Sequence, residues 1–380
     1  MARRKGKSRR RIKDWYSRFV SGEEDGGTEA RRQKLSSQRA VKLPPDRRDA
    51  DADRDAVGLE DLPKTRGMVV GFYPGGAVVR VDGRDMLCGI AKTFRAPDGA
   101  SALAVGDDAT VALTRGRHAD ATGADRDRAD GMVLSRQLRR TVLARPRPRS
   151  GKFRDAHADD TFEKVIVANM DALVIVAATR QPALRHGLID RYLIIAERGE
   201  LTPVLVVNKI DLGRPDPHVL RDFEAIDVEI VLCSAVSAEG LDALTRALAS
   251  RCSVLAGASG VGKTTLVNAI LPGANAATKA VRHKDDRGRH TTTAAVVYDL
   301  PTGGIIVDTP GVRELGMTLD ADELPWYFPE FEAVAPECSF NDCTHTHEPG
   351  CAVQAAVASG AIGRRRYASY LRLLETLGEP

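Results

Sequence analysis

Gly257-Ala-Ser-Gly-Val-Gly-Lys-Thr264 has the pattern G-x-x-x-x-G-K-[ST], which predicts a loop that binds phosphate groups. A short apolar run, Ser253–Ala256, precedes it, and helical sequence from Thr264 to Leu271 follows it. This order places backbone N–H groups of a glycine-rich turn and of a helix N-terminus around the phosphates. We expect Lys263 to reach the β- and γ-phosphates and the Thr264 hydroxyl to bind Mg²⁺. The stretch therefore predicts the strand–loop–helix unit of an α/β domain.

A second motif, Asn208-Lys209-Ile210-Asp211, fits the N-K-x-D pattern that reads guanine. It directly follows an apolar run, so the Asp211 carboxylate can accept hydrogen bonds from guanine N1–H and from the N2 amino group. Adenine has no such pair of donors, and a buried carboxylate left unpaired costs ~1–3 kcal/mol. Ser234-Ala235, after the next apolar run, matches the loop that supports the base. These residues predict a site for GTP and GDP rather than ATP.

Asp308-Thr-Pro-Gly311 fits D-x-x-G and follows another apolar run, Gly304–Val307. We expect Asp308 to hold Mg²⁺ through water and the Gly311 N–H to contact the γ-phosphate. In an ordinary GTPase the phosphate loop comes first in the chain and N-K-x-D follows it. Here N-K-x-D comes first, followed by Ser-Ala, the phosphate loop and D-x-x-G. The sequence therefore predicts the parts of a GTP site in a circularly permuted chain.

The segment Arg287–Thr293 is polar, basic and contains glycine, as expected of a mobile switch. Within it we favour Thr292 over Thr291 as the residue that completes the Mg²⁺ shell. Ordinary small GTPases carry a water-orienting Gln just after D-x-x-G, where this chain has Val312. Slow intrinsic hydrolysis is expected unless another group orients the water, and His290 is the nearest candidate in the sequence. The alternative is that His290 contacts RNA or caps the switch.

Three cysteines and a histidine form the pattern Cys338-x4-Cys343-x-His345-x5-Cys351. Three thiolates and one imidazole suit tetrahedral Zn²⁺, and a closed site with four protein ligands is structural. His347 is an alternative to His345, because both lie in one Thr-His-Thr-His run. The spacing predicts one structural Zn²⁺ that helps to fold a short segment, and it favours a reducing compartment.

The composition, with 43% hydrophobic and 28% charged residues, is that of a globular protein, and 380 residues leave room for two or three domains. The apolar runs are far too short to span a bilayer and no secretory signal is recognisable, so we expect a cytoplasmic protein with no membrane partner. Residues 1–48 carry sixteen Lys or Arg against six Asp or Glu. This basic tail favours a polyanionic partner such as nucleic acid, with a solubilising disordered tail as the alternative.

Four regions are expected along the chain. Residues 1–60 form a basic, disordered extension. Residues 61–150 contain alternating runs and turn signals for about five short strands, which favours an OB-fold barrel that binds RNA or, alternatively, packs against protein. Residues 151–325 alternate buried-type strands with helices and predict a circularly permuted P-loop GTPase domain with a doubly wound parallel sheet. Residues 326–380 form a zinc-binding helical domain, so the fold class is multidomain α/β.

The combination of motifs resembles one known family. The order N-K-x-D, S-A, phosphate loop, R-H-T-T, D-T-P-G-V, together with C-x4-C-x-H-x5-C and a preceding barrel, is similar to that of the ribosome small-subunit-dependent GTPases A (RsgA or YjeQ) over residues 66–375. The resemblance implies a bacterial cytoplasmic GTPase that acts late in maturation of the small (30S) ribosomal subunit. It also implies binding to 16S rRNA and hydrolysis that is stimulated by the subunit. We further expect a monomer.

The expected cofactors are GTP or GDP, Mg²⁺ at the nucleotide and one structural Zn²⁺. The expected catalytic residues are His290, Lys263 and Gly311. The expected nucleotide-binding residues are Asn208, Lys209, Ile210, Asp211, Ser234, Ala235, Gly257, Ala258, Ser259, Gly260, Val261, Gly262, Lys263, Thr264, Thr265, Thr292 and Asp308, and the expected zinc ligands are Cys338, Cys343, His345 and Cys351. The alternatives are another circularly permuted ribosome-assembly GTPase and a zinc-dependent rRNA-binding protein with a weak nucleotide site.

Overall fold

The computed structural model describes residues 59, 61–73, 75–97, 103–114, 130–146, 163–271, 295–309 and 319–378. These residues belong to two compact units, one made of residues up to 103 and 107–139, the other of residues 104–106 and from 140 onward. The predictions for the basic extension, for the switch residues His290 and Thr292, and for Gly311 lie outside the described residues.

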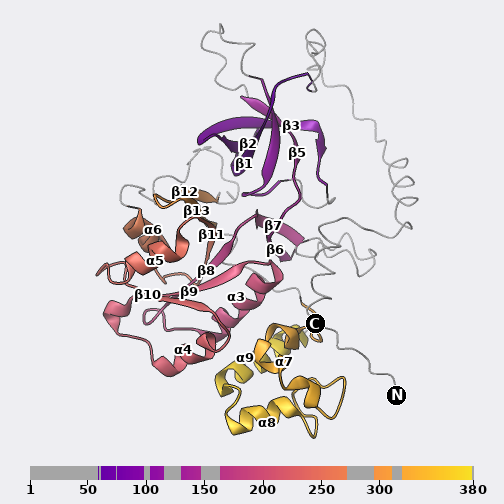
Figure 1. Ribbon diagram of the computed structural model, residues 1–380, viewed down its shortest axis with the longest axis vertical. Coiled ribbons are helices and arrows are strands. Elements are labelled where there is room, and N and C mark those ends of the chain that lie inside the picture. Colours follow the sequence, from indigo (N-terminus) through magenta and orange to yellow (C-terminus); the bar gives the residue numbers. More distant parts are fainter. Residues whose placement is uncertain are drawn as a thin grey trace, which may run out of the picture. The chain divides into compact units, whose positions relative to one another are not determined.

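The first unit is a closed barrel of five strands (Figure 1). The strands are β1 (Lys64–Tyr73), β2 (Gly76–Val81), β3 (Arg84–Arg95), β4 (Asp108–Leu113) and β5 (Gly131–Arg136). Their order is β1-β2-β3-β5-β4, and pairing of β4 with β1 closes the barrel. β3 and β5 are parallel, whereas the other neighbours are antiparallel. This arrangement confirms the predicted OB-like barrel.

Strand alternation fills the inside of the barrel. In β2, Ala77, Val79 and Val81 are buried and alternate with more exposed residues, as a period of two requires. They pack in one apolar cluster with the buried residues of the other four strands. Arg139 and Asp107 form a buried ion pair in the same unit, with side chains 1% and 0% exposed and two hydrogen bonds of 2.7 and 2.8 Å.

The second unit is built on a six-stranded sheet with the order β10-β9-β8-β11-β13-β12. Its strands are β8 (Ala172–Ala178), β9 (Thr202–Asn208), β10 (Glu229–Leu232), β11 (Arg251–Ala256), β12 (Val296–Asp299) and β13 (Gly304–Asp308). β12 is antiparallel to β13, and the other five strands are parallel. Because the five parallel strands end at the same edge, the loops that follow them meet there.

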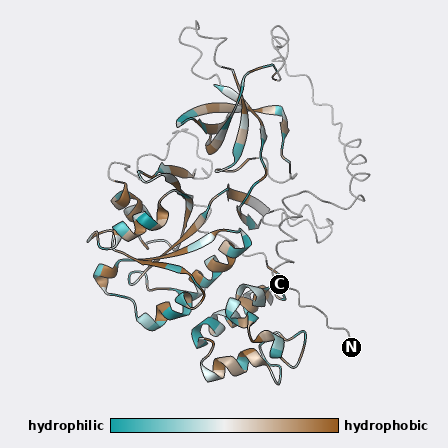
Figure 2. Ribbon diagram, viewed as in Figure 1, coloured by the Kyte–Doolittle hydropathy of each residue, from teal (hydrophilic) through white to brown (hydrophobic). Residues whose placement is uncertain are grey.

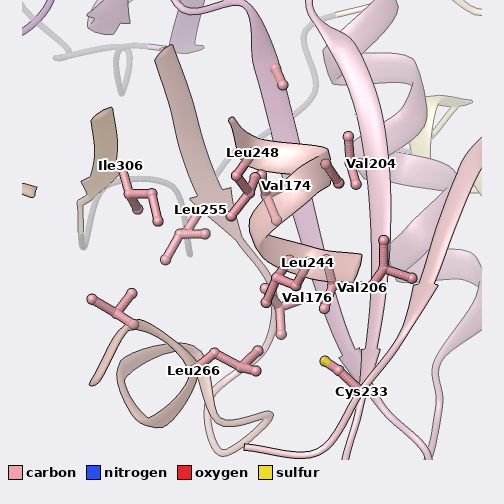
Figure 3. Close-up of a cluster of buried hydrophobic side chains, with 14 of the residues drawn as sticks. Val174, Val176, Val204, Val206, Cys233, Leu244, Leu248, Leu255, Leu266 and Ile306 are labelled. Atoms are coloured by element: carbon pink, nitrogen blue, oxygen red, sulfur yellow. The ribbon is translucent and has the colours of Figure 1, made fainter. Parts of the chain in front are cut away.

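Helices cover both faces of this sheet. They are α3 (His186–Arg198), α4 (Pro217–Glu224), α5 (Leu241–Leu248) and α6 (Lys263–Ile270). On one face, Val174 and Val176 of β8 pack with Leu244 and Leu248 of α5 and with residues of α6 (Figure 3). On the other, Ile175 of β8 shares a pocket with residues of α3. Every residue of β8 is therefore buried, and Figure 2 shows the central strands as predominantly hydrophobic. The predicted doubly wound sheet is confirmed.

Two further groups of elements complete the second unit. β6 (Val142–Pro146) and β7 (Glu163–Ala168) form a two-stranded antiparallel sheet that the sequence did not reveal. After the large sheet come short helices that hold the Cys/His cluster. These are η4 (Leu324–Tyr327), α7 (Pro329–Glu332), η5 (Ala335–Glu337), α8 (Ala352–Ser359) and α9 (Arg364–Gly378). We call residues 319–378 the cysteine module.

Candidate nucleotide-binding site and metal centre

The predicted phosphate loop lies between the end of β11 and the start of α6. Gly257 and Gly262 have φ angles of +139° and +96°, which side-chain-bearing residues rarely adopt. A Cβ on Gly257 would lie 2.2 Å from the Val176 carbonyl oxygen, and one on Gly262 would lie 2.5 Å from Asn208 Nδ2. Both positions therefore need glycine for the loop to pass this close to its neighbours. α6 begins at Lys263, directly after this loop, and a helix N-terminus favours anions.

The lysine of this loop is already oriented. Lys263 is 6% exposed, and its ammonium group donates hydrogen bonds to the carbonyl oxygens of Gly257 at 2.7 Å and of Ala258 at 2.9 Å. Thr264 and Thr265, at the start of α6, are exposed. The loop thus combines a positioned cation with accessible hydroxyl groups, which are the groups that a phosphate chain with Mg²⁺ requires.

Asn208, at the end of β9, ties the phosphate loop to the next loop along the sheet edge. Its side chain is 1% exposed, and its Nδ2 donates to the Val261 carbonyl at 2.9 Å. Its Oδ1 accepts a hydrogen bond of 3.2 Å from the Ala235 backbone N–H. Because both ends of the amide are used, Asn208 fixes the separation between the predicted guanine site and the predicted phosphate site.

Lys209 lies beside it in the left-handed conformation, with φ of 64°. Its ammonium group donates to the carbonyl oxygen of Gly260 at 2.7 Å and to that of Gln181. The hydroxyl of Thr179 donates to the Lys209 carbonyl at 2.7 Å. The loop after β8, which includes Thr179 and Gln181, is therefore a further part of the site. Sequence reasoning missed it, because these two contacts use one common hydroxyl and one main-chain carbonyl.

Asp211 is exposed and lies on the short helix η2 (Ile210–Leu212). The buried Ser234 hydroxyl donates to Asp211 Oδ1 at 2.5 Å. The same hydroxyl accepts the N–H groups of Val236 at 3.2 Å and Ser237 at 3.0 Å. One carboxylate oxygen of Asp211 is thereby oriented, and the rest of the group stays accessible to a base with paired N–H donors.

Asp308 ends β13, which pairs with the strand that leads into the phosphate loop. It is half-buried, and Thr309 after it is buried. The structure therefore brings the D-x-x-G aspartate, the phosphate loop, N-K-x-D and Ser-Ala to one edge of the sheet. The phosphate loop and the N-K-x-D loop meet at this edge although N-K-x-D precedes the phosphate loop in this chain, the reverse of the usual order.

The Cys/His cluster has the dimensions of a metal site. The four ligand atoms of Cys338, Cys343, His345 and Cys351 all lie within 4.8 Å of one another. His345 Nδ1 is 3.6 Å from Cys338 Sγ and 3.5 Å from Cys351 Sγ, and these two sulfur atoms are 4.0 Å apart. Tetrahedral Zn²⁺ with ordinary bond lengths would give edges of about 3.6 Å for N–S and about 3.8 Å for S–S. The residues present therefore fit a zinc ion.

The structure distinguishes the two candidate histidine ligands, His345 and His347. His345 is 4% exposed and lies among the three thiols, whereas His347 is exposed and its Nδ1 lies 2.8 Å from the Thr346 hydroxyl. The Glu348 carboxylate accepts backbone N–H groups of Thr344 at 2.7 Å and of Thr346 at 3.0 Å, which shapes the loop around His345. Glu348 escaped sequence reasoning because most of its partners are main-chain N–H groups, with the Thr344 hydroxyl as a further donor.

A sequence model of the family described as RsgA GTPase matches residues 139–318. The small ribosomal subunit biogenesis GTPase RsgA of Chlorobaculum tepidum is 42% identical over 258 residues, covering 67% of this chain and 81% of the relative. That of Chlorobaculum parvum is 37% identical over 304 residues, covering 78% and 93%.

Solved structures agree with these sequence relatives. The crystal structure of YjeQ from Thermotoga maritima superimposes with a TM-score of 0.62 at 30% identity, covering 84% of this chain and all of that one. YloQ, described as a circularly permuted GTPase, gives a TM-score of 0.59 at 24% identity, covering 86% and 99%, and supports the fold. In the ranges that the structure describes, none of the helices has the length and apolar character needed to cross a membrane.

Proposed function

Since the chain belongs to the RsgA GTPase family and is a GTP hydrolase, we propose that it binds the small ribosomal subunit and hydrolyses GTP to assist or check late maturation of that subunit. The observation that carries the proposal is the set of loops at one sheet edge, joined by Asn208 between Val261 and Ala235. The two relatives, which this chain matches over 81% and 93% of their length, are named for biogenesis of the small subunit. The protein would act as a monomer in the cytoplasm, on 16S rRNA.

Different residues of the site would bind the base, the phosphates and Mg²⁺. Asp211, oriented by Ser234, would accept the guanine N1–H and N2 amino group, and the N–H of Ala235 would lie near the base. Lys263 and the N–H groups of the phosphate loop, Gly257–Thr265, would neutralise the phosphates. Thr264 and Asp308, with Thr292 of the switch, would hold Mg²⁺, which supplies charge neutralisation at the β- and γ-phosphates.

Hydrolysis then needs a group that orients water. Val312 follows D-x-x-G and cannot make a hydrogen bond to water through its side chain. We assign this task to His290, with the Gly311 N–H at the γ-phosphate, once contact with rRNA orders the switch. We expect slow turnover by the protein alone and fast turnover on the subunit, since contact with the subunit would place the water-positioning group.

The cysteine module has its own part in the proposal. Cys338, Cys343, His345 and Cys351 would hold one structural Zn²⁺, which would cross-link this short segment. The barrel and this module would then offer separate surfaces to rRNA. Two linked contacts on one RNA raise the overall affinity above that of either alone.

The test is GTP hydrolysis by the purified full chain, with ATP as control nucleotide, alone and with isolated small or large ribosomal subunits. We expect slow hydrolysis of GTP alone, strong stimulation by small subunits, and neither stimulation by large subunits nor hydrolysis of ATP. His290→Ala should bind GTP normally and lose the stimulation. Equal stimulation by large subunits would refute the proposed partner, and fast turnover without ribosomes would refute the partner-ordered switch.

A further inference from the structure

Helix α9 contacts both the loop of the Cys/His cluster and two helices of the large sheet, α3 and α4. The Tyr367 hydroxyl donates to the His345 carbonyl at 2.6 Å, and the Tyr370 hydroxyl donates to the Thr344 carbonyl at 2.6 Å. These bonds attach α9 to the loop that carries the histidine of the cluster. The two residues before Tyr367, Arg365 and Arg366, reach instead to α3 and α4.

Arg366 forms the central contact of this interface. Its guanidinium donates to Asp190 Oδ1 of α3 and, in a two-pronged arrangement, to the Glu330 carboxylate at 2.7 and 3.1 Å. It also lies 4.5 Å from the centre of the Phe328 ring. Arg366 is 4% exposed and Asp190 is 1% exposed. Charges buried to this degree are tolerated when paired, so neither α3 nor α9 can leave the other without exposing or stranding a charge.

Arg365 extends the same contact. Its guanidinium lies 3.0 Å from His186 Nε2 and donates to the His218 carbonyl at 2.8 Å. It also pairs with Asp222 of α4 at 3.5 Å. His186 and Asp190 are four residues apart in α3 and therefore lie on one face of that helix. α9 thus contacts α3 at His186 and Asp190 and α4 at His218 and Asp222.

The opposite side of α3 faces the nucleotide loops. Leu188, Ile189 and Tyr192 line an apolar pocket whose other walls include Ala258 and Val261 of the phosphate loop. Pro182 and Leu184, in the segment that leads into α3, line the same pocket. That segment also bonds to Lys209 through Thr179 and Gln181. One helix therefore touches the cysteine module on one face and the predicted GTP site on the other.

From this arrangement we propose that Asp190 and Arg366 are positioning residues for GTP binding, acting through α3. A docked α9 fixes α3, and α3 fixes the phosphate loop and the loop that holds Lys209. This route is separate from the direct chain connection between D-x-x-G and the cysteine module. The inference rests on the proposed nucleotide site. Because coupling between two sites is reciprocal, nucleotide should tighten the α3–α9 contact as much as that contact tightens nucleotide binding.

The first test uses the unaltered full chain with zinc bound. Amide hydrogen exchange in α9 is followed without nucleotide, with GDP, and with a non-hydrolysable GTP analogue, after binding of each has been measured. We expect nucleotide to slow exchange in α9 at least threefold, with the barrel strand β2 unchanged. Nucleotide that binds tightly and leaves α9 exchange unaltered would overturn the inference alone. Absence of any GTP binding would overturn the proposed nucleotide site and the inference with it.

The second test compares matched variants. Asp190→Asn keeps the size of the side chain and an acceptor for Arg366 but removes the charge, and we expect about fivefold weaker nucleotide binding, at the low end of typical coupling between sites. Asp222→Asn removes a carboxylate from the same interface on α4, away from the pocket, and should change binding less than twofold. Arg366→Lys keeps the charge without the two-pronged geometry and should fall between them.

Zinc content and thermal stability are measured for each variant, so that loss of the fold is distinguished from loss of coupling. In Asp190→Asn the nucleotide-dependent slowing of exchange in α9 should disappear. Equal losses of affinity in Asp190→Asn and Asp222→Asn would show general loosening of the interface and refute the route through α3. Unchanged affinity in both Asp190→Asn and Arg366→Lys would refute it as well.

Discussion

Replacing Asp211 by Asn should change which purine the protein binds. The Ser234 hydroxyl donates to Asp211 Oδ1 at 2.5 Å and in turn accepts two backbone N–H groups, so its proton has a fixed direction. In Asp211→Asn the amide oxygen must take the place of Oδ1, because that position has to accept a hydrogen bond. The amide NH₂ then takes the other position and faces the amino group of guanine.

The size of the effect follows from the bonds involved. One hydrogen bond to a charged acceptor, worth ~1.5–3 kcal/mol, is lost, and a second is weakened when the charge is removed. A total near ~3 kcal/mol corresponds to guanine nucleotide affinity lower by on the order of 100-fold, since each ~1.4 kcal/mol is a factor of ten. Xanthine carries a carbonyl where guanine carries the amino group, so the same variant should gain affinity for xanthine nucleotides.

The assay is displacement of a fluorescent GDP analogue by unlabelled GDP, XDP and ADP. The matched control is Asp216→Asn, because Asp216 caps helix α4 by accepting the His218 N–H at 2.9 Å, and Asn caps helices equally well. We expect the control to bind as the parent does. If Asp211→Asn loses less than threefold for GDP, or gains nothing for XDP, Asp211 does not read the base.

Three further predictions concern stability and reactivity. Asp107→Ala should destabilise the barrel by about 3–5 kcal/mol in urea unfolding, because it removes the carboxylate that pairs with the buried Arg139 guanidinium. Asp85→Ala, which breaks the partly exposed pair with Arg80, should cost less than about 1 kcal/mol. Removal of the metal with a chelator should abolish the protection of α7 and α8 against amide hydrogen exchange, and Cys351→Ser should do the same and lower the zinc content below one ion per chain. Full protection without metal would contradict a structural zinc. Burial raises the pKa of Cys88 from 9.0 to about 11 and that of Cys233 to about 12, so both thiols should react with iodoacetamide at pH 8 more slowly than half-buried Cys252. The free energy of unfolding should also fall as pH rises above 9, because the thiols of the unfolded chain ionise there while those of the folded chain keep their protons.

The sequence predicted the large sheet well for a physical reason. Parallel strands covered on both faces are continuous apolar runs, and Ala172–Ala178 is such a run with every residue buried. Loops after these strands carry the binding motifs, so identifying the strands also located most of the site. By contrast, β12 (Val296–Asp299) is a four-residue edge strand, and β6 and β7 pair with each other across a long connection. Short strands without a hairpin turn leave little local signal.

The contacts of the candidate site that escaped prediction involve atoms and residue pairs that no motif records. Motifs identify residues whose side chains are expected to meet the ligand, such as Lys263 and Asp211. They are silent on residues that act through main-chain atoms, such as Gln181, whose carbonyl holds Lys209. They are also silent on pairs that are distant in the chain. Asp190 and Arg366 are 176 positions apart, and neither lies in a motif.

Once the fold is known, the position of Asp190 in the sequence indicates that its carboxylate needs a partner. It stands in the apolar run Leu188-Ile-Asp-Arg-Tyr-Leu-Ile-Ile195, within a helix whose neighbouring residues Ile189, Tyr192 and Ile194 are buried. A buried carboxylate without a partner costs several kcal/mol, so such a helix requires a cation from elsewhere in the chain. Arg366 meets that requirement from the cysteine module. We therefore infer that part of the stability of α3 comes from a segment that follows the whole sheet. The predicted GTP site, whose phosphate loop lines a pocket with α3, would depend on the same contact.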